Sequence, residues 1–193
     1  MKENKHIEEF FSAIAPKWDS FEDHDKAYLE SLFDSFSIQK EDKVLDLACG
    51  TGVMEEYLLK RVNKVDAIDI SPEMIEIAKK KYPLDKVNYQ AIDFFDYDKE
   101  GYDIVLIFNA YPHFVNKERF ALQLHKVLKK GGRFIILHDL SRQRLTAHHS
   151  TVPHDISFEL SPVEEEGKYL EDRFTLLRKE EDERHYLIIG EKK

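Results

Sequence analysis

The chain has 193 residues, 42% of them hydrophobic and 35% charged, which is typical of one soluble globular domain of ordinary size. Its formal net charge of −9 argues against non-specific binding to nucleic acid or to an anionic membrane. The sequence has no long apolar span and no apolar signal segment near its start, so we expect a cytoplasmic protein. Its single cysteine, Cys49, can form no internal disulfide and is expected to be a packing residue.

The first 40 residues carry aromatic and aliphatic positions at helical spacing, and Pro16 divides them into two predicted helices. Residues 44–54 begin as an apolar strand and pass directly into a turn that contains Gly50 and Gly52, and a helix is predicted over 54–62. A strand, a glycine turn and a helix in this order present backbone N–H groups to a ligand above the strand's carboxyl end. The sequence therefore predicts the main ligand site at this turn.

The ligand is predicted not to be a dinucleotide. The dinucleotide fingerprint requires a third glycine at position 55, where this chain has Glu55, followed by Glu56. Two carboxylates in the first helical turn would repel a diphosphate at the same helix N-terminus. Asp46 adds negative charge just before the turn, where a ligand ammonium could bind. A net-cationic ligand is therefore favoured.

Further strands are predicted over 65–70, 87–92, 102–108 and 133–138. A helix over 72–81 follows the N-cap Ser71, with Pro72 at its first position, and a second helix over 117–130 is expected to end at Gly131 and Gly132. Because strands and helices alternate, these strands should form a parallel sheet. Segments 173–178 and 186–190 are predicted to be two further strands joined by the acidic turn 180–183.

Residues 46–52, Asp-Leu-Ala-Cys-Gly-Thr-Gly, resemble the first motif of the class I S-adenosylmethionine-dependent methyltransferases. The resemblance runs from about residue 10 to the C-terminus and is strongest over 44–93. It implies an α/β fold with a Rossmann-like, seven-stranded, mostly parallel sheet that an antiparallel C-terminal hairpin closes. It also implies a single methyltransferase domain over 1–193, with N-terminal lid helices in 1–40 and the cofactor-binding core in 41–193.

The resemblance also implies which residues bind the cofactor, S-adenosylmethionine. Asp69 lies 17 residues beyond Gly52, where an α/β nucleotide fold places the acid that accepts hydrogen bonds from both ribose hydroxyls. Asp93 matches the acid that accepts a hydrogen bond from the adenine amino group. Ile70 and Met74 would pack against the adenine.

The segment Ala-Pro-Lys-Trp-Asp is similar to one that lies over the cofactor in methyltransferases of the ubiquinone-biosynthesis type. Trp18 and Asp19 are therefore either lid residues or packing residues of the N-terminal helices. The predicted cofactor-binding set consists of Asp46, Ala48, Gly50, Gly52, Asp69, Ile70, Met74, Asp93, Phe94, Asn109 and Trp18.

The loop 109–114 follows the fourth strand and contains a Pro-His-Phe sequence similar to one in small-molecule methyltransferases. Its Asn-Ala-Tyr-Pro start departs from the pattern of the enzymes that methylate exocyclic amines of DNA bases, so we do not infer that activity. His113 in this loop and His138 at the end of the fifth strand are candidate catalytic bases, because histidine titrates near neutral pH.

Four of the nine histidines, His138, His148, His149 and His154, fall within 17 positions. They have two interpretations: a polar active-site wall with exposed histidines on a helix over 142–149, or a divalent-metal site in which His113 could join them. The predicted function is transfer of a methyl group to a small-molecule acceptor. A regulatory or metal-responsive protein that binds S-adenosylmethionine without chemistry is the alternative, and an NAD-linked reductase is disfavoured by the two glutamates.

Overall fold

A computed structural model of the chain describes residues 4–20, 23–82, 85–149 and 156–193, with the side chains left out at 147–149. The chain forms two compact units, Met1–Tyr97 and Asp98–Lys193. Every helix within the described residues is too short or too polar to span a membrane.

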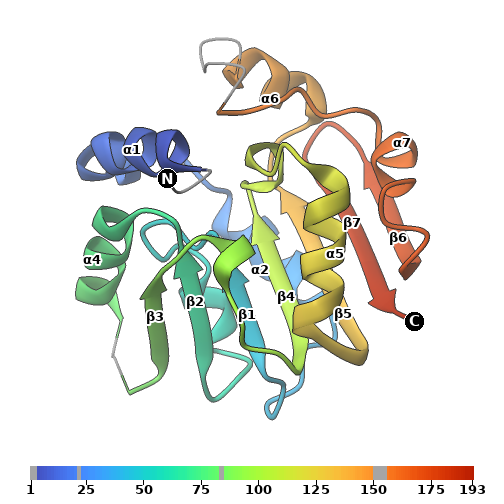
Figure 1. Cartoon of the computed structure of the whole chain (residues 1–193), viewed down its shortest axis with the longest axis horizontal. Coiled ribbons are helices and arrows are strands. Elements are labelled where there is room, and N and C mark those ends of the chain that lie inside the picture. The colour runs from blue at the N-terminus through green and yellow to red at the C-terminus, as the bar shows by residue number, and fades with distance from the viewer. Residues whose placement is uncertain (1–3, 21–22, 83–84, 150–155) are drawn as a thin grey trace. The chain divides into compact units, whose positions relative to one another are not determined.

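The first unit begins with three helices: α1 (Lys5–Ile14), the 3-10 helix η1 (Ala15–Ser20) and α2 (Lys26–Ser35), so the break expected at Pro16 is present. Its strands are β1 (Val44–Leu47), β2 (Val65–Asp69) and β3 (Val87–Ala91), and both pairings are parallel. Its other helices are α3 (Glu55–Leu58), α4 (Pro72–Lys81) and the 3-10 helix η2 (Phe94–Asp96) (Figure 1).

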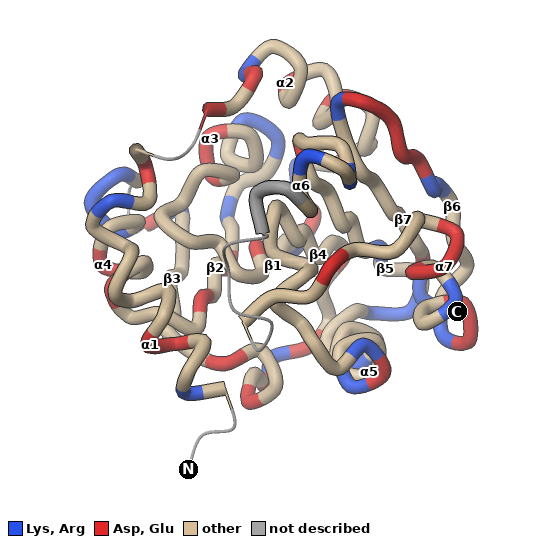
Figure 2. The backbone as a smooth tube through the Cα atoms, turned by 90° about the horizontal axis from the view of Figure 1, so that it is seen from above, with Lys and Arg blue, Asp and Glu red and all other residues tan. Residues whose placement is uncertain are grey.

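The bounds of α4 agree with the prediction because its end signals are local. The Ser71 hydroxyl accepts a hydrogen bond from the Met74 backbone N–H at 3.1 Å, and Pro72 occupies the first turn. Three lysines, Lys79, Lys80 and Lys81, form the last turn, where positive charge suits the helix dipole (Figure 2).

The helix after the glycine turn is shorter than predicted. It ends at Leu58 rather than at residue 62, because the next turn changes to tighter hydrogen bonding: the Arg61 backbone N–H donates to the Leu58 carbonyl at 2.8 Å. The Tyr57 carbonyl accepts instead from the Arg61 guanidinium, at 2.9 Å.

The second unit contains β4 (Tyr102–Phe108), the 3-10 helix η3 (Tyr111–His113), α5 (Lys117–Val127) and β5 (Leu128–His138). It continues with α6 (Arg142–His149), α7 (Val163–Gly167), β6 (Phe174–Glu181) and β7 (Tyr186–Lys192). Strand β5 pairs with β4 in parallel and with β7 in antiparallel orientation, and β6 pairs antiparallel with β7. The strand order is β3-β2-β1 in the first unit and β4-β5-β7-β6 in the second, which confirms the predicted parallel strands and the antiparallel C-terminal hairpin.

Two predicted boundaries in this unit are wrong. Gly131 and Gly132 do not end a helix but lie inside β5, which begins at Leu128. The pairing with β4 shifts register between Tyr102 and Ile104, so the glycines form an irregular stretch of the strand. The β6–β7 turn is also shorter than predicted, because Glu181 still pairs with Tyr186.

Candidate functional site

Residues 48–52 form the turn between β1 and α3. Ala48, Gly50 and Gly52 have positive φ angles of 59°, 55° and 89°, a backbone region that is costly for residues other than glycine. The Cys49 backbone N–H donates to the Ile68 carbonyl at 3.0 Å, which fixes the turn beside the end of β2. Three predicted cofactor residues thus form one turn at the carboxyl end of β1.

Asp69, the predicted ribose acid, lies at the same place. Its Oδ2 accepts from the Gly50 backbone N–H at 2.9 Å, and its Oδ1 accepts from the Ser71 backbone N–H at 2.8 Å. Burial raises the pKa of Asp69 to about 6, although the bonds from Ser71 and Gly50 act in the opposite direction. Each oxygen retains a lone pair, so the carboxylate can still accept from a ligand hydroxyl.

Asp46 and Glu55 bring two further carboxyl groups to the turn, and their side chains are almost completely buried, with 1% and 0% of the residue exposed. Oδ2 of Asp46 and both carboxyl oxygens of Glu55 have no hydrogen bond of normal geometry to any described residue. Burial raises the pKa of Glu55 to about 7. Burial also raises the pKa of Asp46, and the negative charge of Glu55 raises it further. The turn is therefore an acidic, largely desolvated environment.

The sequence analysis treated Glu55 and Glu56 together as acids that would repel a diphosphate, but the structure separates the two residues. The Glu56 side chain is 42% exposed and forms ion pairs with Lys26 at 3.5 Å and Lys60 at 3.9 Å. Only Glu55 belongs to the buried site, and no local sequence signal distinguishes it from its neighbour.

The 3-10 helix η1 places Trp18 and Asp19 beside the glycine turn. A Cβ atom added to Gly50 would lie 3.7 Å from Trp18 Nε1. The Asp19 carboxylate accepts from the Thr51 hydroxyl at 2.5 Å and from Lys81 at 2.8 Å. This placement supports the lid interpretation, and Thr51 and Lys81 are rim residues that the sequence analysis missed.

The predicted adenine contacts lie at the ends of the neighbouring strands. Asp93 accepts from the Phe95 backbone N–H at 3.0 Å and from the Asn4 amide at 2.8 Å, and therefore caps η2. Met74 and Phe94 are buried, whereas Ile70 is partly exposed. These roles in cofactor binding stay predictions.

In the second unit, Asn109 and Asp139 join the carboxyl ends of β4 and β5. The Asn109 amide donates to Asp139 Oδ1 at 2.8 Å, and the Asp139 backbone N–H donates to Asn109 Oδ1 at 3.3 Å. Asn109 has a φ of 51°, so this pair holds an unusual backbone conformation at the start of the loop 109–114.

The two candidate bases differ in accessibility. His113 is partly exposed, and its Nδ1 lies 3.0 Å from the Ile156 carbonyl oxygen. A carbonyl can only accept, so Nδ1 carries the proton, and Nε2 is then the basic nitrogen of the neutral ring. His138 has 0% of its surface exposed, and its ring centroid lies 5.9 Å from that of Tyr186. Of the two, the geometry favours His113 as the base.

A buried lysine, which the sequence analysis missed, supports the His113 loop. Lys117 Nζ lies 3.3 Å from the ring centroids of both Tyr111 and Phe158 and 3.8 Å from Glu166 Oε2. The Tyr111 hydroxyl donates to the same Glu166 oxygen at 3.1 Å. Burial lowers the pKa of Lys117 to about 6, while the Glu166 carboxylate opposes this change. The cluster ties α5 and α7 to the loop.

The described residues do not support the metal hypothesis. Within them, no group of three or more histidine, cysteine or acidic side chains could hold a metal ion. The side chains of His148 and His149 lie outside the described part of the chain, as does the whole of His154. The hypothesis thus stays untested for those three residues.

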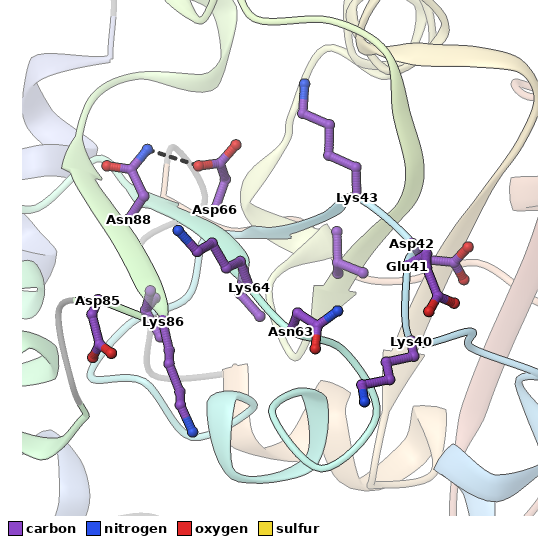
Figure 3. Close-up of a pocket in the computed structure, with 13 residues that line it drawn as sticks. Lys40, Glu41, Asp42, Lys43, Asn63, Lys64, Asp66, Asp85, Lys86 and Asn88 are labelled. Atoms are coloured by element: carbon purple, nitrogen blue, oxygen red, sulfur yellow. Dashed lines mark hydrogen bonds between the residues drawn. The ribbon is translucent and has the colours of Figure 1, made fainter.

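A pocket of about 440 Å³ lies at the opposite ends of the first three strands, where Val44, Val65 and Val87 begin them (Figure 3). Lysines, acids and asparagines line it, and the Asn88 amide donates to Asp66 Oδ1 at 2.7 Å. Parallel α/β sheets bind ligands at the carboxyl ends of their strands, so this pocket is not the predicted cofactor site.

Residues 45–136 match a family model described as a methyltransferase domain. The chain is 28% identical over 150 residues to a ubiquinone/menaquinone biosynthesis C-methyltransferase of Wigglesworthia glossinidia brevipalpis, covering 70% of this chain and 60% of that protein. A methyltransferase of Haloferax volcanii, solved with the Trm112 methyltransferase activator, is similar with a TM-score of 0.78 and 17% identity, over 94% of this chain and 97% of that one. A structure titled DhpI-SAH complex has a TM-score of 0.74 and 20% identity, over 97% and 96% of the two chains.

The chain spans 48–60% of the length of the first three curated relatives it matches. Both of these solved structures are below 25% identity and establish the fold alone. Together with the match over residues 45–136, they show that the chain is similar to methyltransferases and has their fold.

Proposed function

We propose that the protein binds S-adenosylmethionine and transfers its methyl group to a small-molecule acceptor. The observation that carries this proposal is the group of buried carboxyls, Asp46, Glu55 and Asp69, around the glycine turn. Such a site favours a ligand with positive charge, and S-adenosylmethionine has a sulfonium and an ammonium group. When bound, the cofactor supplies an activated methyl group. A relative named for ubiquinone and menaquinone biosynthesis supports a small-molecule acceptor.

The chain's own residues would bind and orient the cofactor. Asp69 would accept hydrogen bonds from ribose hydroxyls while the Gly50 and Ser71 N–H groups hold it in place. Asp46 would attract the ammonium, and Trp18 beside Gly50 would exclude water from the turn. The remaining members of the predicted set, with Asp93 and Asn109 among them, are proposed to contact the cofactor.

On the acceptor side, His113 would take the proton at Nε2 as the acceptor attacks, with its ring orientation fixed by the Ile156 carbonyl. Methyl transfer needs the two reactants in line, and such positioning can supply about 7–11 kcal/mol of the barrier. The Lys117 cluster and the Asn109–Asp139 pair would keep the His113 loop rigid for this purpose.

Calorimetric titration with S-adenosylmethionine, S-adenosylhomocysteine and NAD tests the binding half of the proposal. We expect binding of the two sulfur nucleosides and none of NAD, and the reverse result would refute the proposal. A screen of small metabolites for S-adenosylhomocysteine release tests the chemical half. Binding without turnover on any acceptor would favour the alternative, a regulatory protein that binds the cofactor.

A further inference from the structure

Glu55 is the most unusual polar residue of the first unit. It is completely buried, and both of its carboxyl oxygens and Asp46 Oδ2 have no hydrogen bond of normal geometry to a described residue, although the Tyr89 hydroxyl lies near enough to Glu55 to lower its pKa. Buried carboxyl groups are normally paired or hydrogen-bonded, because an unpaired buried charge is costly. Such a group in a native fold points to a functional role.

The position of Glu55 relates it to the cofactor turn. Its Oε2 lies 3.2 Å from where a Cβ on Gly52 would be, and Ala78 of α4 closes the other side at 3.3 Å. The pairing registers place Asp46, Ala67 and Tyr89 side by side across β1, β2 and β3. The Glu55 carboxyl therefore lies beside Gly52 of the glycine turn, and it is near enough to Asp46 for its charge to raise the Asp46 pKa.

Almost all the groups that face Glu55 are acids or neutral hydroxyl and thiol groups. From the turn, the strands and α4 with its C-cap, they are Cys49, Asp46, Tyr89, Tyr82 and Lys81, and Asp69 acts on Asp46 in turn. The cation among them, Lys81, is hydrogen-bonded to Asp19 and Thr51 at the rim. Two carboxylates close together in a desolvated site cannot both ionise without a large cost, which favours a state in which one of them keeps a proton.

We propose that Asp46 and Glu55 carry a proton between them in the cofactor-free protein and release it to solvent when S-adenosylmethionine binds at the turn. Only an O–H bond breaks in this step, and the anion that remains stabilises the positive ligand. S-adenosylhomocysteine has no sulfonium, so it should displace less of the proton. The pair would then favour the methyl donor over the product, increasingly as pH rises. This inference rests on the proposed function, because it assumes that the cofactor binds at this turn.

Calorimetric titration in two buffers with different ionisation enthalpies measures the protons released on binding. With burial raising the pKa of Glu55 to about 7, we expect about half a proton released for each S-adenosylmethionine bound at pH 7. Release should be smaller with S-adenosylhomocysteine. Glu55→Gln keeps the shape without the titrating proton and should reduce the release with S-adenosylmethionine by at least half. The ligand's own ammonium titrates equally in both proteins, so it cancels from this comparison.

Glu56→Gln is the matched control, because it removes a carboxylate from the same helical turn on the exposed side. It should release as many protons as the unchanged protein. In the unchanged protein, affinity for S-adenosylmethionine should rise by up to about tenfold for each pH unit below 7 and level off above it, with a weaker rise for S-adenosylhomocysteine. This pH dependence of affinity tests the inference without the variant, if Glu55→Gln fails to fold.

Two results separate this inference from the proposed function. Normal binding of both nucleosides with equal proton release, or with the same release in Glu55→Gln, would overturn the inference and leave the proposed function intact. If neither nucleoside bound, the inference and the proposed function would both be overturned.

Discussion

Replacing Glu55 by glutamine should stabilise the folded protein at alkaline pH and change it little at acidic pH. Burial raises the pKa of Glu55 from 4.5 to about 7 in the folded state. The contribution of an acid with a raised folded-state pKa is fully present below its unfolded pKa and is lost as pH rises through the folded one. The folded protein must therefore bear the cost of ionising Glu55 above pH 7, and a glutamine removes that cost.

The magnitude follows from the two pKa values. At about 1.36 kcal/mol for each pH unit between 4.5 and 7, the free energy of unfolding of Glu55→Gln should exceed that of the unchanged protein by roughly 3 kcal/mol at pH 8. At pH 5 the same relation leaves a difference of about 1 kcal/mol or less. Urea unfolding of both proteins at several pH values between 5 and 8 measures this directly.

Glu56→Gln provides the control, because its exposed carboxylate should change the unfolding free energy by less than about 1 kcal/mol at any of these pH values. A difference for Glu55→Gln that is the same at pH 5 and pH 8, or a loss of stability that grows with pH, would show that Glu55 does not titrate in the folded protein.

Three other predictions concern the strand, the cofactor and the base. Gly132→Ala should lower the unfolding free energy by about 1–3 kcal/mol, because its Cβ would lie 2.6 Å from the Tyr102 carbonyl oxygen. Gly131→Ala is the control: its Cβ would meet open space, so only the cost of its positive φ should lower the unfolding free energy. Asp69→Ala should weaken S-adenosylmethionine binding by roughly 1.5–3 kcal/mol in calorimetry, and unchanged affinity would remove it from the ribose site. His113→Ala should lower kcat by about 10²–10⁴ with cofactor affinity unchanged, and full activity would exclude His113 as the base.

The sequence by itself determined the order of strands and helices and the place of the glycine turn. These features depend on signals that act over a few residues: the serine cap and proline that start α4, the continuous apolar run of β4, and the glycines at positive φ. Where residues close in sequence fix the backbone, a segment keeps its structure in any fold that accommodates it. The helix over 72–81 and the strand over 102–108 therefore begin and end at the predicted residues.

The tertiary structure alone decided which similar residues enter the site. Glu55 and Glu56 are the same amino acid at adjacent helical positions, and a rotation of about 100° between them sends one into the interior and the other to solvent. Lys117 looks like a surface lysine at a helix start, yet Tyr111 and Phe158 enclose it. Burial and pKa depend on contacts between segments far apart in the chain, and local sequence patterns carry no record of those contacts.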